Sequence, residues 1–201
     1  MAKLYFRYGT VSSAKTLNLL AVAHNYRQQN KKVLLLKPAL DDRYGKNNIK
    51  SRAGLQTQAD LLIDESTDLT HICLKDVDCI LVDEAQFMPV KIIDQLRHIT
   101  LKLNIPVICY GLRTDFRTYL FEGTRRLMEV ADSIEEVKST CFYCHKKAVV
   151  NIRHVNGQAS LSGQTIELGA DERYVPACFG CYLEQHAQTD VKTIEQFLSL
   201  V

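Results

Sequence analysis

Apolar and polar positions alternate in blocks along the first 110 residues, and the blocks predict strands and helices in turn. Short apolar runs occupy residues 4–8, 32–37, 79–82 and 106–110, and the first and last are each closed by a glycine. Continuous apolar runs of this length are typical of strands that are buried on both faces of a parallel sheet. We therefore expect these four segments to be strands of one sheet.

Two longer segments between these runs carry apolar residues at helical spacing. Residues 15 to about 30 form the first, and residues 89–103 form the second, which begins with a proline as helices often do. Strands that alternate with helices predict an α/β core with a parallel sheet. Residues 41–55 are polar and contain glycine, so we expect a loop there. Its basic residues are Arg43, Lys46, Lys50 and Arg52.

The character of the chain changes near residue 140. Beyond it lie cysteines, β-branched residues and the dipeptide Asn156-Gly157, which predicts a hairpin with a type I′ turn after a strand at 149–155. We place a domain boundary here, giving an α/β domain at 1–139 and a smaller domain with the C-terminal tail at 140–201. The tail from 191 to 201 is expected to be a short helix.

Composition and charge narrow the class of protein. The chain has 201 residues, 46% of them hydrophobic and 24% charged, with a net charge of +2, which is ordinary for a globular protein. The near-neutral charge gives no indication of a nucleic-acid or membrane partner. No apolar run reaches the roughly 18 residues of a membrane span, and the N-terminus lacks the apolar stretch of a signal peptide. A cytoplasmic location is the expectation.

The residues after the first strand nearly match the phosphate-binding pattern G-x-x-x-x-G-K-[ST]. Backbone N–H groups and the start of the following helix would bind phosphate oxygens, a lysine would reach the β- and γ-phosphates, and a threonine hydroxyl could ligate Mg²⁺. The departure is an alanine in place of the second glycine. If the loop needs a positive φ there, the alanine costs about 1–2 kcal/mol. The residues are Gly9, Thr10, Val11, Ser12, Ser13, Ala14, Lys15 and Thr16.

Two carboxylates follow the apolar strand at 79–82. Asp83 would hold Mg²⁺, and Glu84 would lie near the γ-phosphate as a general base. This pattern leaves the acceptor open, since the base could activate a hydroxyl or, in an ATPase, a water. Solvated acids at the end of a strand are also common. The order of the two motifs along the chain favours a nucleoside-triphosphate site.

Four of the seven cysteines form two C-x-x-C pairs. Each pair can point both sulfurs at one ion, and four thiolates make a closed tetrahedral Zn²⁺ site. Such a site has no open position, so we expect structural zinc. Cys73, Cys79 and Cys109 lie in apolar segments and are expected to be buried. The proposed ligands are Cys141, Cys144, Cys178 and Cys181.

Several of these segments together carry a resemblance to a known family. Residues 83–87 read D-E-A-Q-F, residues 111–116 read G-L-R-T-D-F, and E-R-Y at 172–174 precedes the second cysteine pair. In this order, with the phosphate loop, they resemble the thymidine kinases of the cytosolic and bacterial zinc-containing type. The resemblance runs from residue 2 to about 185. It implies a RecA-like P-loop core with a parallel sheet, and a small zinc-ribbon-like domain that carries a lasso loop at about 156–175.

The resemblance also implies an activity. It would be transfer of the ATP γ-phosphoryl group, with Mg²⁺, to the 5′-hydroxyl of thymidine in nucleotide salvage, by a homotetramer that dTTP inhibits. Glu84 matches the catalytic base, Asp83 the Mg²⁺ ligand, and Ala85 and Gln86 continue the nucleotide site. Residues assigned to the nucleoside are Phe87, Leu112, Phe116, Phe121, Glu167, Tyr174 and, for phosphate or sugar, Arg52.

The departures from the family pattern keep two alternatives open. Val11 stands where the family usually has methionine, and Ala14 replaces glycine. The chain could therefore be a catalytically weakened homologue that binds dTTP or thymidine without efficient turnover. A P-loop ATPase with a zinc ribbon that acts on nucleic acid is a third hypothesis, which the low net charge disfavours. A basic stretch is either a solvated or subunit-contacting face or part of a triphosphate site: Arg113, Arg117, Arg125 and Arg126.

Overall fold

A six-stranded parallel sheet forms the centre of the computed structural model, which describes residues 1–163 and 174–187. The strand order is β5-β2-β6-β7-β1-β8, and every neighbouring pair is parallel. The predicted parallel α/β core is confirmed. The strands are β1 (Leu4–Tyr8), β2 (Val33–Pro38), β5 (Leu61–Ile63), β6 (Cys79–Val82), β7 (Val107–Gly111) and β8 (Ser133–Glu136).

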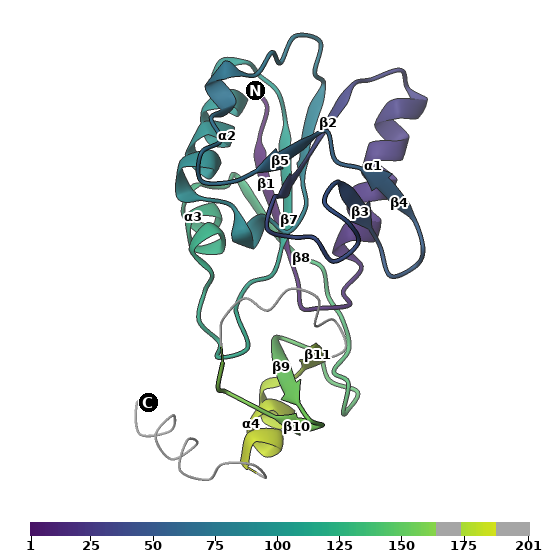
Figure 1. The fold of residues 1–201 in the computed structure, drawn as a ribbon, viewed down its shortest axis with the longest axis vertical. Helices are drawn as coiled ribbons and strands as arrows, with labels where there is room; N and C mark the ends of the chain where they lie inside the picture. Colours follow the sequence, from purple (N-terminus) through teal and green to yellow (C-terminus); the bar gives the residue numbers. More distant parts are fainter. Residues whose placement is uncertain (164–173, 188–201) are drawn as a thin grey trace.

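Helices cover both faces of this sheet (Figure 1). On one face, α1 (Lys15–Gln28) packs Leu19 and Leu20 onto apolar residues of β2, β6 and β7. On the other face, α2 (Val90–Lys102) and α3 (Glu122–Val130) pack against the opposite sides of β1, β2, β6 and β7. Because both faces are buried, β6 and β7 have no exposed position, which explains their continuous apolar sequences.

A second, three-stranded sheet lies beyond the carboxyl ends of the large sheet (Figure 1). Its antiparallel strands are β9 (Val150–Val155), β10 (Gln158–Ala159) and β11 (Tyr174–Ala177), and α4 (Phe179–Ala187) packs on them. Asn156 and Gly157, which join β9 to β10, have φ of 52° and 82°. Positive φ at both positions is the signature of the predicted type I′ turn.

The segment 41–55 is more ordered than the predicted loop. It contains β3 (Asn48–Lys50), which pairs with β4 (Gln56–Gln58) in a short antiparallel hairpin. Ile49 is the cause, because its side chain is buried in the same apolar cluster as Leu19 and Leu20 of α1. A single apolar residue in a polar segment gives no periodic signal, so the strand was not predicted.

The remaining predictions concern the three cysteines outside the C-x-x-C pairs, the C-terminal tail and membrane-spanning helices. Cys79 and Cys109 are buried as expected, but Cys73 is exposed, in the segment between the 3₁₀ turn Leu69–His71 and β6. The predicted helix at 191–201 lies outside the described residues. Among the residues that the structure describes, no helix has both the length and the apolar character needed to cross a membrane.

Candidate functional site

Four strands of the large sheet deliver the residues of one cavity. The segments that follow β1, β2, β6 and β7 meet at the carboxyl edge of the sheet, where parallel α/β proteins bind ligands. The cavity has a volume of about 330 Å³. It is lined by most of the phosphate-binding loop and by Asp41, Arg43, Arg52, Asp83, Glu84 and Leu112.

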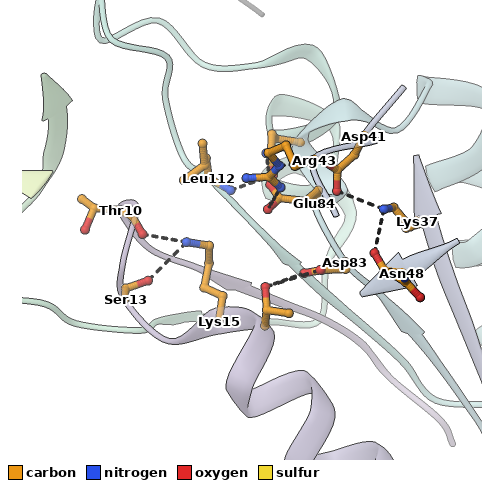
Figure 2. A network of polar contacts seen from close by, with 12 residues as sticks. Thr10, Ser13, Lys15, Lys37, Asp41, Arg43, Asn48, Asp83, Glu84 and Leu112 are labelled. Atoms are coloured by element: carbon orange, nitrogen blue, oxygen red, sulfur yellow. Dashed lines mark hydrogen bonds and ion pairs between the residues drawn. The ribbon is translucent and has the colours of Figure 1, made fainter. Parts of the chain in front are cut away.

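The loop at 9–16 joins β1 to α1 in the way that the sequence predicts. Lys15 is buried and donates from Nζ to the carbonyl oxygen of Thr10 at 2.6 Å and to Oγ of Ser13 at 3.3 Å (Figure 2). Ala14 has a φ of 64°, so the alanine does occupy a left-handed position that favours glycine. Burial lowers the pKa of Lys15 to about 8, partly offset by the nearby charges of Glu84 and Asp83.

Asp83 lies directly beside the start of α1. The hydroxyl of Thr16 donates to Oδ1 of Asp83 at 3.2 Å, which places two oxygen ligands side by side at the cavity wall. Hard oxygen donors are the ligands that Mg²⁺ prefers, so these two residues fit that ion. Burial, together with the adjacent charge of Glu84, raises the pKa of Asp83.

Glu84 is fixed by two side chains from different elements. Arg43 donates from Nη2 to Oε1 of Glu84 at 2.5 Å, and Gln86 donates from Nε2 to Oε2 at 2.6 Å. Burial alone would raise the pKa of Glu84, but Arg43 and Lys15 outweigh that effect and lower the pKa. The carboxylate is therefore ionised, which is the state that a general base requires.

Gln86 connects this carboxylate to the next strand. Its Oε1 accepts a hydrogen bond from the backbone N–H of Leu112 at 2.8 Å, so the side chain is engaged at both ends and is only 2% exposed. Gly111 allows this close approach, because a Cβ at that position would lie 2.8 Å from Oε1 of Gln86. The sequence predicts Gln86 in the nucleotide site. In the structure its side chain links Glu84 to the backbone of Leu112.

A charged network behind Glu84 was not predicted. Arg43 also donates from Nε to Oδ1 of Asp41 at 2.7 Å, and Lys37 reaches Oδ2 of Asp41 at 3.3 Å (Figure 2). Lys37 is only 1% exposed and donates to the carbonyl oxygen of Asn48 at 2.9 Å. The sequence shows Arg43 only as one of several basic residues in a polar segment, and Lys37 only as the last residue of an apolar run. Nothing in their spacing indicated this pairing.

The residues assigned to the nucleoside fall into three groups: residues that line the cavity, aromatic residues that are not among its lining, and residues outside the described part of the chain. Leu112 and Arg52 line the cavity, and Arg52 donates to Oγ of Ser12 at 2.5 Å. Phe87 and Phe121 pack edge to face with ring centroids 5.4 Å apart, and Phe116 lies 6.4 Å from Tyr174. These four rings are not among the described residues that line the cavity. Glu167 and residues 164–173, which make up half of the predicted lasso loop at about 156–175, lie outside the described residues.

The arginines of the basic stretch after β7 differ in their surroundings: three of them contact other residues of the chain and one is exposed. Arg113 donates to the carbonyl oxygen of Val149 at 2.8 Å, and Arg117 lies over the ring of Phe116 at 4.9 Å. Arg126 pairs with Asp94 and Glu129, and Arg125 is exposed. Within the described part of the chain, none of these four arginines is among the residues that line the cavity. Both interpretations, a solvated or subunit-contacting face and a part of a triphosphate site, stay predictions.

The four cysteines of the two C-x-x-C pairs converge beside the small sheet. Their sulfurs all lie within 4.8 Å of one another, and the Sγ atoms of Cys144 and Cys178 are 3.7 Å apart. Four sulfurs at about 2.3 Å from a central Zn²⁺ are separated by about 3.8 Å in a tetrahedron. All seven cysteines are free thiols, so no disulfide competes with metal binding. The geometry and the donor set fit zinc.

A phosphate-binding loop, an adjacent Asp-Glu pair at the end of a buried strand and a separate four-cysteine cluster define a P-loop nucleotide-binding protein with a site suited to structural zinc. The sequence family model described as "Thymidine kinase" matches residues 2–182. The chain belongs to the thymidine kinase family.

Curated relatives agree with this assignment. The chain is 41% identical to the thymidine kinase of Lactococcus lactis over 89% of its own length and 95% of that protein. It is 42% identical to the thymidine kinase of Lactiplantibacillus plantarum, with 89% and 94% covered, and 40% identical to that of Enterococcus faecalis, with 89% and 93% covered. The similarity therefore extends over nearly the full length of these proteins.

Proposed function

We propose that this protein is an ATP-dependent thymidine kinase. The 5′-oxygen of thymidine attacks the γ-phosphorus of ATP, the bond from that phosphorus to the β,γ-bridging oxygen breaks, and ADP leaves. The proton of the 5′-hydroxyl passes to Glu84. The observation that carries the proposal is that Glu84 and the phosphate-binding loop line the same cavity.

The ATP phosphates fit the loop side of the cavity. Backbone N–H groups at the start of α1 and the ammonium of Lys15 would bind the β- and γ-phosphates. Asp83 and the hydroxyl of Thr16 would hold Mg²⁺, which when bound would neutralise charge on the phosphates. Positioning and electrostatic stabilisation then account for most of the catalysis, as in other phosphoryl transfers.

The thymidine side of the proposal rests on Leu112 in the cavity wall and on the neighbouring aromatic residues. Leu112 follows β7 directly, and Phe116 and Tyr174 bring the segment after β7 together with β11. A nucleoside base needs aromatic faces and an apolar niche for its methyl group. The family resemblance alone adds the lasso loop with Glu167, a homotetramer, inhibition by dTTP and a cytoplasmic location.

The proposal assigns separate structural roles to the two sheets. The domain at 1–139 would hold ATP, and the domain at 140–201 would hold Zn²⁺ through the four cysteines and cover the nucleoside. The sulfur cluster lies among the residues that pack the small sheet onto α4, so the ion would stabilise that domain and take no part in the phosphoryl transfer.

The test is thymidine-dependent release of ADP from ATP and Mg²⁺, compared between the natural chain and Glu84→Gln. We expect the natural chain to release ADP only when thymidine is present, and the variant to lose at least about 100-fold in kcat because the base is removed. Glu135→Gln is the matched control, since Glu135 is exposed on β8 and should leave the rate unchanged. ADP release without thymidine, or full activity of Glu84→Gln, would contradict the proposal.

A further inference from the structure

Two residues in or just before the small sheet contact the phosphate-binding loop: Ser139, in the segment before that sheet, and Asn151, in the sheet itself. The backbone N–H of Val11 donates to Oδ1 of Asn151 on β9 at 2.9 Å. One residue earlier, Oγ1 of Thr10 lies 2.6 Å from Oγ of Ser139. Asn151 is 4% exposed, and β11 pairs with β9 at that position through Pro176. These two side-chain contacts attach the first half of the loop to residues more than a hundred positions away, in addition to the backbone hydrogen bond from the N–H of Gly9 to the carbonyl oxygen of Gly111.

The loop needs such attachment because its backbone is strained. Ser12 and Ala14 have φ of 60° and 64°, and neither is glycine. Residues with a Cβ adopt this left-handed conformation only when the surrounding structure holds them there. Released from its contacts, an alanine returns to right-handed or extended conformations, whereas a glycine populates positive φ about as readily as negative φ.

We propose that Asn151 is a positioning residue that holds the phosphate-binding loop in its binding conformation, and that it offsets the presence of alanine at position 14. This inference rests on the proposed function, because it assumes that the loop binds nucleotide phosphates. Asn151 acts through the backbone of Val11, and Ser139 supports it through Thr10.

The affinity for nucleotide depends on the fraction of molecules whose phosphate-binding loop is in the binding conformation. The apparent dissociation constant of a ligand increases in inverse proportion to the fraction of protein in the binding conformation. Without Asn151, that fraction falls far more for a loop with alanine at position 14 than for a loop with glycine there. The effect of removing Asn151 must therefore depend on residue 14, which a general loss of packing would not produce.

The experiment is a double-mutant cycle on four proteins: the natural chain, Asn151→Ala, Ala14→Gly and the double variant. Calorimetry measures the dissociation constant of ADP with Mg²⁺, and kinetics measures KM for ATP and kcat. We expect Asn151→Ala to weaken ADP binding about 10-fold when residue 14 is alanine and about 2-fold when it is glycine. KM for ATP should rise in parallel, while kcat at saturating ATP changes little.

Two further variants make the test specific. His154→Ala removes a side chain of the same strand, three residues from Asn151 and so on the opposite face of β9, whose Nε2 lies 3.0 Å from the hydroxyl of Tyr143; its effect should not depend on residue 14. Ser139→Ala removes the second attachment and should show the same dependence on residue 14 as Asn151→Ala. It also carries the test if circular dichroism shows that Asn151→Ala does not fold.

The outcomes separate this inference from the proposed function. Equal losses with alanine and glycine at position 14, or no loss in either, would overturn the positioning role. ADP binding that shows the expected dependence, without thymidine-dependent turnover in the natural chain, would keep the positioning role and refute only the kinase. A natural chain that binds no ADP would refute both.

Discussion

Three residues of the site hold left-handed backbone conformations without being glycine: Ser12, Ala14 and Glu84, with φ of 60°, 64° and 48°. Each such position costs about 1–2 kcal/mol, and such positions gather at functional sites. Only the strain at Ala14 could be predicted, because a motif that normally has glycine there revealed it. Ser12 and Glu84 stand at positions where the same motifs show no such preference, so their conformations had no sequence signal.

At the residue scale, the buried ammonium of Lys37 gives the first prediction. Lys37→Met should reduce the free energy of unfolding by about 2 kcal/mol, because the buried carboxylate of Asp41 keeps Arg43 but loses the ammonium at its Oδ2, and the carbonyl oxygen of Asn48 loses the same donor. Urea denaturation at neutral pH measures this. Lys147→Met is the control, since Lys147 pairs with Glu136 at the surface and should cost less than about 1 kcal/mol. Equal losses would show that burial of the pair is energetically irrelevant.

Gln86 gives a second residue-scale prediction, about catalysis. Gln86→Ala should lower kcat about 10-fold or more, because Glu84 loses one of the two side chains that orient its carboxylate. KM for ATP should change little, since the phosphate loop keeps its own contacts. Steady-state kinetics with thymidine and ATP separates the two constants.

A matched control exists in α2. Gln95 makes the same pair of bonds, accepting from the N–H of Leu69 at 3.0 Å and donating to Asp68 at 2.8 Å, on the face of the molecule formed by α2 and the Leu69–His71 turn. Gln95→Ala should leave kcat unchanged. If it lowers kcat as much as Gln86→Ala does, the role of Gln86 is structural only.

At the scale of elements, the sequence predicts those strands and helices that bury apolar side chains in a regular pattern, and it does not predict those that bury small or polar ones. β6 and β7 are buried at every position, so their sequences are unmistakable, and α2 shows its buried stripe of isoleucine and leucine. α3 was missed because its first turn buries Gly123 and Thr124, which are not apolar, and leaves Arg125 exposed. Periodicity detects only segments that face the core with apolar side chains.

Gly123 in that helix gives an element-scale prediction. A Cβ at Gly123 would lie 2.8–2.9 Å from the backbone carbonyl oxygens of Ala85, Gln86 and Met88, so α3 must contain glycine to approach the segment that follows Glu84. Gly123→Ala should lower the free energy of unfolding by about 1–3 kcal/mol, although alanine is the better helix former. Thermal and urea denaturation measure the change.

The control is a glycine in a helix with open space around it. Among the described residues, a Cβ at Gly180, in α4, would meet no atom within 4 Å apart from its chain neighbours and the backbone of its own helix. Gly180→Ala should therefore leave stability unchanged or raise it by up to about 1 kcal/mol through helix propensity. Destabilisation of the same size in both variants would mean that the carbonyl oxygens around Gly123 are not the cause.

At the scale of the whole molecule, the sequence located most of the chemistry but not the way in which it is assembled. The phosphate loop, Asp83, Glu84 and the four cysteines are local motifs, and their neighbours along the chain identify them. Lys37 lies in β2, Arg43 in the segment after it and Asn151 in the small sheet, so only the folded chain brings them together. Contacts between distant segments leave no pattern in a single sequence.

The two sheets give the last prediction, which concerns the order in which parts of the molecule lose structure. The small sheet and α4 share a cluster of eight buried residues, three of which are cysteines of the proposed zinc site. The large sheet has two apolar clusters of its own. A small core cannot supply much stability without a metal, whereas a large one can. Removal of zinc by a chelator under reducing conditions should therefore increase amide hydrogen exchange in β9, β11 and α4, while β1, β6 and β7 stay protected.

Hydrogen exchange followed by mass spectrometry measures both parts of the chain in one sample, and metal analysis confirms that zinc has left. Cys144→Ser should show the same pattern without chelator, because it removes one of the four sulfurs. Cys73→Ser is the matched control, since Cys73 is exposed and outside the cluster, and it should behave as the natural chain. Exchange that stays unchanged after zinc removal would refute a stabilising ion. Simultaneous loss of protection in both sheets would instead show that they unfold as one unit, and the division proposed at residue 139 would then be wrong.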